Sequence, residues 1–112
     1  IDGIAQLEHL EKFTLHNNTF NTLTMLNVKI LVLDDCYLSP RSKIIAVNGT
    51  FSHLYLIDCS PSEWLIDFVN QPDTQLEVLH CSKMRMSAGC RNAITKNANK
   101  IKKLTLIDVI IY

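Results

Sequence analysis

Residues 51–59 read FSHLYLIDC, and this stretch holds the pattern that decides the fold. Its fixed members are Phe51, Leu54, Leu56 and Cys59, at positions one, four, six and nine. The same spacing recurs in segments that begin at residues 10, 28, 76 and 101, so the intervals between first positions are 18, 23, 25 and 25 residues. An apolar template that recurs at such a period is typical of a repeat architecture. We call the five segments the ladder segments.

In each ladder segment, positions four and six are apolar or Cys and flank a polar or mixed residue. Such an alternation over a short run predicts a β-strand with one buried face. Position nine follows the strand and is expected to point into the turn. The residues at positions four and six are Phe13 and Leu15, Leu31 and Leu33, Leu54 and Leu56, Leu79 and Cys81, and Leu104 and Leu106.

Three connections between the predicted strands carry helix-start signals. Ser60 begins a capping box in which Pro61 takes the first helical position and Glu63 reaches back. Ser39-Pro40 predicts a shorter helix, and Ser87 predicts a third. Residues 20–27 are too few for more than an extended or single-turn connection. The residues expected to face inward are Ile44, Ile45 and Val47 in the helix after Pro40, Trp64, Leu65, Phe68 and Val69 in the helix after Pro61, and Cys90, Ala93 and Ile94 in the helix after Ser87.

The ladder resembles the pattern of leucine-rich repeat proteins, Leu-x-x-Leu-x-Leu-x-x-Asn/Cys-x-Leu. The eleventh position is met by Phe20, Leu38, Met86 and Ile111, and Pro61 breaks it. This resemblance implies an α/β solenoid with parallel strands on the concave side and short helices on the convex side. Cys at position nine before a helix is similar to the cysteine-containing subclass found in intracellular F-box adaptors. The departures from the pattern are Cys81 at a leucine position and Met84 and Val109 at position nine.

The length of the chain fits one domain, residues 1–112, which holds about five repeats. The chain has 11 basic and 11 acidic side chains, so its formal net charge is zero, and 47% of its residues are hydrophobic. Nucleic-acid binders usually concentrate Lys and Arg on one face, and this balance does not indicate nucleic acid. No stretch approaches the roughly 20 apolar residues of a membrane helix. Because solenoids need atypical terminal repeats and both ends are abrupt, we expect an uncapped part of a longer array.

Residues on the exposed side of the predicted strands are the candidates for contacting a partner. Tyr is a favoured interface anchor, and the aspartates would add a mild acidity that suits a basic or mixed peptide surface. We predict that a protein partner contacts Tyr55, Ile57, Asp34, Asp35, Asp58, His80 and Asp108. In register, the strands give three columns: Thr14, Val32, Tyr55, His80 and Thr105; His16, Asp34, Ile57, Ser82 and Ile107; and Asn17, Asp35, Asp58, Lys83 and Asp108.

The sequence predicts no catalytic, metal or cofactor site. It has neither a Gly-rich phosphate loop nor a Gly-x-Ser-x-Gly motif, and its Cys and His spacings do not match zinc sites. Cys36 and Cys59 share position nine on adjacent segments, at the inter-strand spacing of about 4.8 Å. That distance permits a disulfide, and it also suits two small thiols packed in a repeat. Free buried thiols fit a reducing compartment.

Three functions stay open for such a surface. The first is an intracellular adaptor, cytoplasmic or nuclear, that recognises a protein through its concave face. The second is a secreted or cell-surface receptor ectodomain, which the glycosylation motifs at Asn17 and Asn48 favour. The third is an architectural subunit whose concave face packs within a larger multi-subunit complex.

Overall fold

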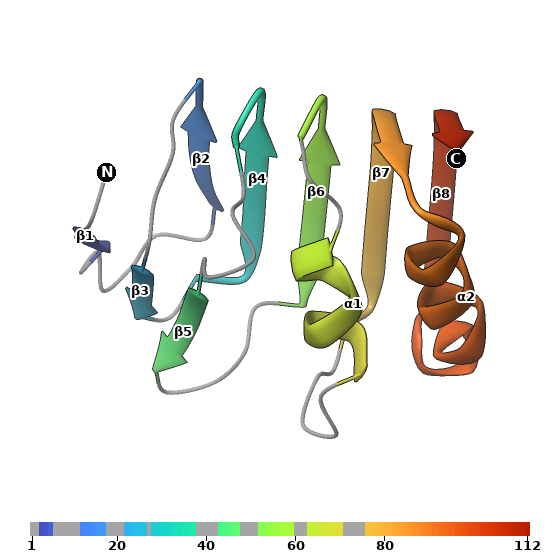
Figure 1. Cartoon of the computed structure of the whole chain (residues 1–112). Coiled ribbons are helices and arrows are strands. Elements are labelled where there is room, and N and C mark those ends of the chain that lie inside the picture. The colour runs from blue at the N-terminus through green and yellow to red at the C-terminus, as the bar shows by residue number, and fades with distance from the viewer. Residues whose placement is uncertain are drawn as a thin grey trace.

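The computed structural model describes residues 3–5, 12–17, 22–26, 28–37, 43–47, 52–59, 63–70 and 76–112. Strands and helices alternate along the C-terminal part of the chain, whereas the elements described before residue 58 are strands (Figure 1). In chain order the elements are β1 (Gly3–Ala5), β2 (Lys12–His16), β3 (Thr22–Leu26), β4 (Ile30–Asp34), β5 (Lys43–Val47), β6 (His53–Ile57), α1 (Glu63–Asn70), β7 (Val78–Met86), α2 (Ala88–Lys96), the 3-10 helix η1 (Ala98–Lys100) and β8 (Lys103–Ile111).

The five ladder segments form one parallel sheet in the order β2-β4-β6-β7-β8. Equivalent ladder positions are paired throughout, so that Leu31 lies beside Leu54, Leu54 beside Leu79, and Leu79 beside Leu104. Parallel neighbours require a connection that returns the chain to the same end of the sheet, and each ladder interval supplies one. The predicted strands, their register and the α/β class are confirmed.

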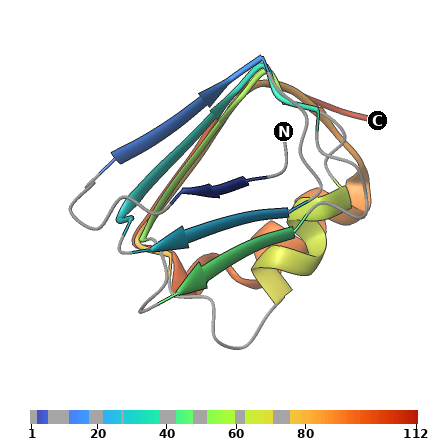
Figure 2. The same ribbon diagram turned by 90° about the vertical axis from the view of Figure 1, so that its left-hand side faces the viewer.

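The connections form a second layer on one side of this sheet (Figure 2). Strands β1, β3 and β5 pair in parallel as a smaller sheet, and helices α1 and α2 occupy the same layer toward the C-terminus. The extended connection predicted for residues 20–27 is confirmed over its described part, because Thr22–Leu26 form β3.

The prediction of a helix after Pro40 is wrong. Residues Lys43–Val47 form β5, in which Ile44 pairs with Leu23 and Ile45 with Thr24 of β3. β-branched side chains lose χ1 freedom in a helix and fit a pleated strand well. With β3 alongside to accept and donate backbone hydrogen bonds, the extended form is the favoured one. The expected start of that helix at Ser39 lies outside the described residues.

Helices α1 and α2 bury the faces predicted for them. In α1, Trp64 and Leu65 are buried, and the Trp64 ring stacks on Phe68 with centroids 5.1 Å apart. In α2, Ser87 is confirmed as the N-cap because its Oγ accepts a hydrogen bond from the Cys90 N–H at 3.1 Å. The predicted cap of α1, Ser60, lies outside the described residues. Neither described helix has the length and apolar character needed to cross a membrane.

The core lies between the main sheet and the second layer. Residues at ladder positions four and six of the three central strands are completely inaccessible to solvent: Leu31, Leu33, Leu54, Leu56, Leu79 and Cys81. Position nine is also buried at Cys36 and Cys59, which follow β4 and β6, and at Met84. The expectation that position nine follows the strand is wrong for Met84 and Val109, because β7 and β8 continue past them to Met86 and Ile111. Full burial of one such leucine stabilises the fold by roughly 1.5–3 kcal/mol.

Asn97 joins the two helices through a buried amide. Its Nδ2 donates to Oδ1 of Asn70 at 2.9 Å and to the carbonyl of Ala93 at 2.8 Å. We expect Asn97→Ala to lower the free energy of unfolding by about 1–3 kcal/mol, because the substitution removes both bonds at a buried site. Urea denaturation measures the change. Asn92→Ala, at an exposed position of the same helix, is the control, and an equal loss in both variants would contradict the assigned role.

Candidate functional site

The side of the main sheet that faces away from the second layer is the candidate binding surface (Figure 2). Among the described elements, none covers it. We call it the open face and define it by every second residue of the five strands. Its three rows are Lys12, Ile30, His53, Val78 and Lys103; Thr14, Val32, Tyr55, His80 and Thr105; and His16, Asp34, Ile57, Ser82 and Ile107, each row in register across the sheet.

The centre of the open face is apolar and aromatic. Val32, Tyr55 and Ile57 are half-buried and lie on adjacent strands. The rings of Tyr55 and His80 lie face to face at a tilt, with centroids 5.4 Å apart and an interplanar angle of 34°. A ring held by a neighbouring ring loses little side-chain freedom when a partner binds, which favours its use as an anchor. His53 lies one row away, where its Nδ1 is 2.7 Å from Oγ of Ser52.

The residue directly after each third-row residue of the open face has a left-handed backbone conformation. These corner residues are Asn17, Asp35, Asp58, Lys83 and Asp108, with φ between 52° and 54°. Asn and Asp are the side chains that best tolerate this region after Gly, which explains their recurrence. The backbone N–H of Asp58 donates to the Ser82 carbonyl at 2.9 Å, and that of Asp35 donates to the Ile57 carbonyl at 2.8 Å. Asp35 and Asp58 therefore lie at the turns that directly follow β4 and β6, whereas Lys83 and Asp108 lie within the longer strands β7 and β8.

The two ends of the strands differ in charge. The strand ends carry Asp34 on the open face and the corner carboxylates Asp35, Asp58 and Asp108, with Lys83 as the exception. Among the residues that the structure describes, the strand starts carry Lys12, Lys29, Lys102 and Lys103, with Glu77 as the exception. The Asp34 carboxylate also lies 3.3 Å from Nδ1 of His16. A partner that lies along the strand direction would meet a basic rim, an apolar centre and an acidic rim in turn.

The structure divides the predicted contact residues into two groups. Tyr55, Ile57, His80 and Asp34 lie together on the open face. Asp35, Asp58 and Asp108 are exposed at the corner instead, so they border the face rather than lie within it.

Sequence reasoning missed the row at the start of the strands. Ile30, His53 and Val78 precede position four and are half-buried on the open face, between Lys12 and Lys103 on the outer strands. The period of two that placed Tyr55 between two leucines extends one step back to His53. The same alternation therefore locates this row from the sequence.

The four cysteines are free thiols, and all are buried. Cys36 Sγ donates to the Leu15 carbonyl at 3.3 Å, and Cys59 Sγ donates to the Leu33 carbonyl at 3.0 Å. Each position-nine thiol thus contacts position six of the preceding ladder segment. The packing interpretation of the Cys36–Cys59 pair is confirmed, and the disulfide alternative is not. Burial raises the pKa of Cys59 and of Cys81 to about 12, because the apolar surroundings disfavour the thiolate.

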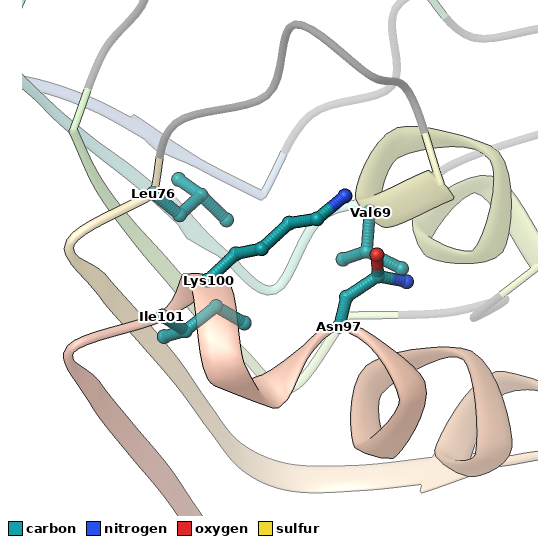
Figure 3. A pocket seen from close by; sticks show the side chains of 5 residues that line it. All are labelled: Val69, Leu76, Asn97, Lys100 and Ile101. Atoms are coloured by element: carbon teal, nitrogen blue, oxygen red, sulfur yellow. The ribbon is translucent and has the colours of Figure 1, made fainter.

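A hollow on the opposite side of the sheet is a packing gap between layers. Val69, Leu76, Asn97, Lys100 and Ile101 line it, and the Lys100 side chain lies across it (Figure 3). Only about 10 Å³ of it is open to the centre of a water-sized sphere. This is far below the ~300–1,000 Å³ of typical ligand pockets. Within the described ranges, no group of three or more His, Cys, Asp or Glu side chains is arranged to hold a metal ion.

The open face is therefore the described surface with the best anchors for a macromolecule. Comparison with family models, with curated proteins and with solved structures finds no match to this chain.

Proposed function

We propose that this protein is a leucine-rich repeat interaction scaffold that binds a protein partner on its open face. The observation that supports it is the register of the sheet, which brings Tyr55, Ile57 and His80 together although 25 residues separate Tyr55 from His80 in the chain. The recurrence of the ladder in register and the second layer on one side support a solenoid with this face as its concave side. Protein–protein interfaces usually have a half-buried aromatic side chain near the centre and charged side chains at the rim.

The charges of the two rims describe the partner. Lysines at the strand starts favour an acidic group on the partner, and Asp35, Asp58 and Asp108 at the strand ends favour a basic one. The apolar centre favours an aliphatic or aromatic side chain between them. The partner surface would therefore be a peptide segment or helix face of mixed charge.

Substituting both Tyr55, the aromatic residue at the centre of the open face, and Asp58, a charged residue of its rim, tests the proposal. We expect Tyr55→Ala combined with Asp58→Lys to weaken partner capture by at least ~30-fold, which corresponds to the ~2 kcal/mol of an interface anchor. Quantitative mass spectrometry of proteins captured from the native source by wild-type and variant chains would measure it. Lys96→Ala, at an exposed position of α2, is the control. Equal capture by the double variant and the wild type would refute a role for the open face.

The four buried thiols support an intracellular location, cytoplasmic or nuclear, because reducing compartments keep cysteines unpaired. An adaptor function is the proposal that suits this location.

The alternative, a secreted or cell-surface receptor ectodomain, is favoured by the exposure of Asn17, which begins one of the glycosylation motifs. Mass spectrometry of the native protein separates them: a glycan on Asn17 or Asn48 would exclude the intracellular adaptor. If the partner proves to be a permanent subunit, the face serves an architectural role in a larger complex.

A further inference from the structure

Strands β4 and β6 carry the apolar centre of the open face. Val32 and Tyr55 are partners in register, and Ile57 follows on the next row of β6; all three are half-buried. Both strands lie inside the sheet, with β2 beside β4 and β7 beside β6, so the exposure of this face does not come from an edge of the sheet. We call this pair of strands the β4–β6 track. Its open-face residues are Ile30, Val32 and Asp34 of β4 and His53, Tyr55 and Ile57 of β6.

The track offers few hydrogen bonds to the backbone of a partner. The backbone N–H and C=O groups of β4 and β6 already serve the ladders between these two strands and with β2 and β7. Ile30, Val32 and Ile57 are aliphatic, so an extended segment lying on them would bury unsatisfied N–H and C=O groups, which is costly. An α-helix forms its backbone hydrogen bonds internally and can cover the same side chains with an apolar stripe. The track therefore favours a helix over an extended segment.

The end of the track is acidic. Asp34 is the last residue of β4, and Asp35 and Asp58 directly follow β4 and β6. Asp35 and Asp58 are exposed, and the Asp34 side chain is 38% exposed, so all three carboxylates are accessible to a partner. At the other end, Lys29 precedes β4 and is exposed. Positive charge on a partner is therefore favoured at the strand ends, and negative charge at the start of β4.

Strand β7 limits the acidic end on one side. Its charges have the opposite order, with Glu77 before the strand and Lys83 at the corner position. Glu77 is also paired with Lys102, whose Nζ lies 3.5 Å from Glu77 Oε1. A partner that carries positive charge at the strand ends and lies along the strands is therefore best matched over β4 and β6, and not over β7.

We propose that the β4–β6 track binds a short amphipathic helix of a partner protein, with the N-terminal end of that helix at Asp34, Asp35 and Asp58. Its binding there rests on the proposed function, in which the open face is the contact surface. A helix carries a partial positive charge at its N-terminus and a partial negative charge at its C-terminus, so this direction matches both ends of the track. Lys or Arg in the first turn would pair directly with the carboxylates. The five residues of β4 span about 16 Å, which a helix of about 11 residues covers.

A cross-linked helical peptide of about 14 residues is a suitable probe, since short helices are marginal in water without such a constraint. It carries leucines at i, i+3, i+4 and i+7 and an Arg in its first turn, and its ends are acetylated and amidated. Titrated into the 112-residue chain with a nitroxide at its N-terminal end, it should broaden the amide signals of Asp35 and Asp58 more than those of Lys29 and His53. A nitroxide at its C-terminal end should give the reverse. The opposite pattern, or no binding, would overturn the proposal.

Charge reversal at the corner residues checks the direction of the helix. Asp35→Lys combined with Asp58→Lys should weaken binding of the probe at least about tenfold, and a probe with Glu in place of its first-turn Arg should bind this variant more tightly than the Arg form does. Lys83 already occupies the equivalent corner position at φ 53°, so the fold accommodates Lys there, and circular dichroism checks that the variant is folded. Lys96→Ala, on α2, is the control and should leave binding unchanged. Equal binding of the Arg probe by the double variant and the wild type would also overturn the proposal.

A peptide without the cross-link and with its leucines at every second position is the extended control. If it binds as tightly as the helical probe, the track does not select a helix and the proposal is wrong. Binding of the helical probe to the 112-residue chain, but not to the protein from its native source, would mean that a segment of the same protein fills the track, which overturns a partner as the occupant. Failure of the probe, with weaker native capture by the Tyr55→Ala and Asp58→Lys variant, would reject the helix and leave the proposed function standing. Equal native capture by that variant would reject both.

Discussion

Leu54→Ala is expected to lower the free energy of unfolding by about 3–5 kcal/mol. Leu54 has no exposed surface and stands between Leu31 and Leu79 in the sheet, so its side chain packs against both neighbours as well as the second layer. Removing it leaves a cavity that the side chains of both neighbouring strands and of the second layer would have to close. Urea or guanidinium denaturation followed by circular dichroism measures the loss.

Leu104→Ala is the matched control for this prediction. Leu104 occupies the same ladder position on β8, but it is 37% exposed, so its removal takes less surface out of contact. We expect a loss of less than half that of Leu54→Ala, since the cost follows the contacts removed and the cavity left. Equal losses in the two variants would show that a further element covers β8 in solution, and no loss at Leu54 would contradict the core assignment.

Alkylation of Cys59 and Cys81 in the native protein is expected to be about 1,000-fold slower than in the unfolded chain at pH 8. Burial raises the pKa of both thiols from 9.0 to about 12, and the thiolate is the species that reacts. Three pKa units reduce the thiolate population about 1,000-fold at a pH below both values. Iodoacetamide labelling followed by peptide mass spectrometry gives the rate at each cysteine, with the protein in urea as the reference. Rapid native labelling of Cys81 would show that it is not in the core.

The same two thiols predict a loss of stability at high pH. Their protonated form is neutral and is favoured by burial, so the folded-state pKa lies above the unfolded value. The stabilisation is fully present below pH 9 and is lost between pH 9 and about pH 12, by about 1.4 kcal/mol per pH unit for each thiol. A Cys81→Ala variant should show a shallower decline over this range than the wild type. An identical slope would mean that other groups cause the decline.

The helix expected after Pro40 shows where a local pattern was insufficient. Ile44, Ile45 and Val47 fit an apolar face of either a helix or a strand, and the start signal at Ser39 favoured the helix. The pairing of Ile44 with Leu23 decides for the strand, and that partner lies 21 residues earlier in the chain. Local spacing does not encode a contact of this kind, so the pairing with β3 and the β-branched side chains outweighed the helix-start signal at Ser39.

Only part of the candidate site could be predicted from the sequence, because alternation along a strand holds only where the strand is regularly pleated. A period of two places Tyr55 and Ile57 on one face of a strand, and a constant repeat places His80 beside Tyr55 on the next. The corner column could not be assigned by alternation, because its φ near +53° interrupts the pleat on which alternation depends. Asp35, Asp58 and Asp108 therefore became a rim and not part of the face.

The ladder alone was sufficient to predict five strands and the columns of residues that share a face, because a spacing repeated five times places equivalent residues alike; the parallel arrangement was an implication of the family resemblance. Tertiary structure decided three further features: β5 in place of a helix, the turn at each Asp corner, and the difference between Leu54 and Leu104. Each depends on what lies beside a residue in space. Leu54 and Leu104 hold the same position in their segments, and only the presence or absence of a described neighbouring strand makes one buried and the other exposed.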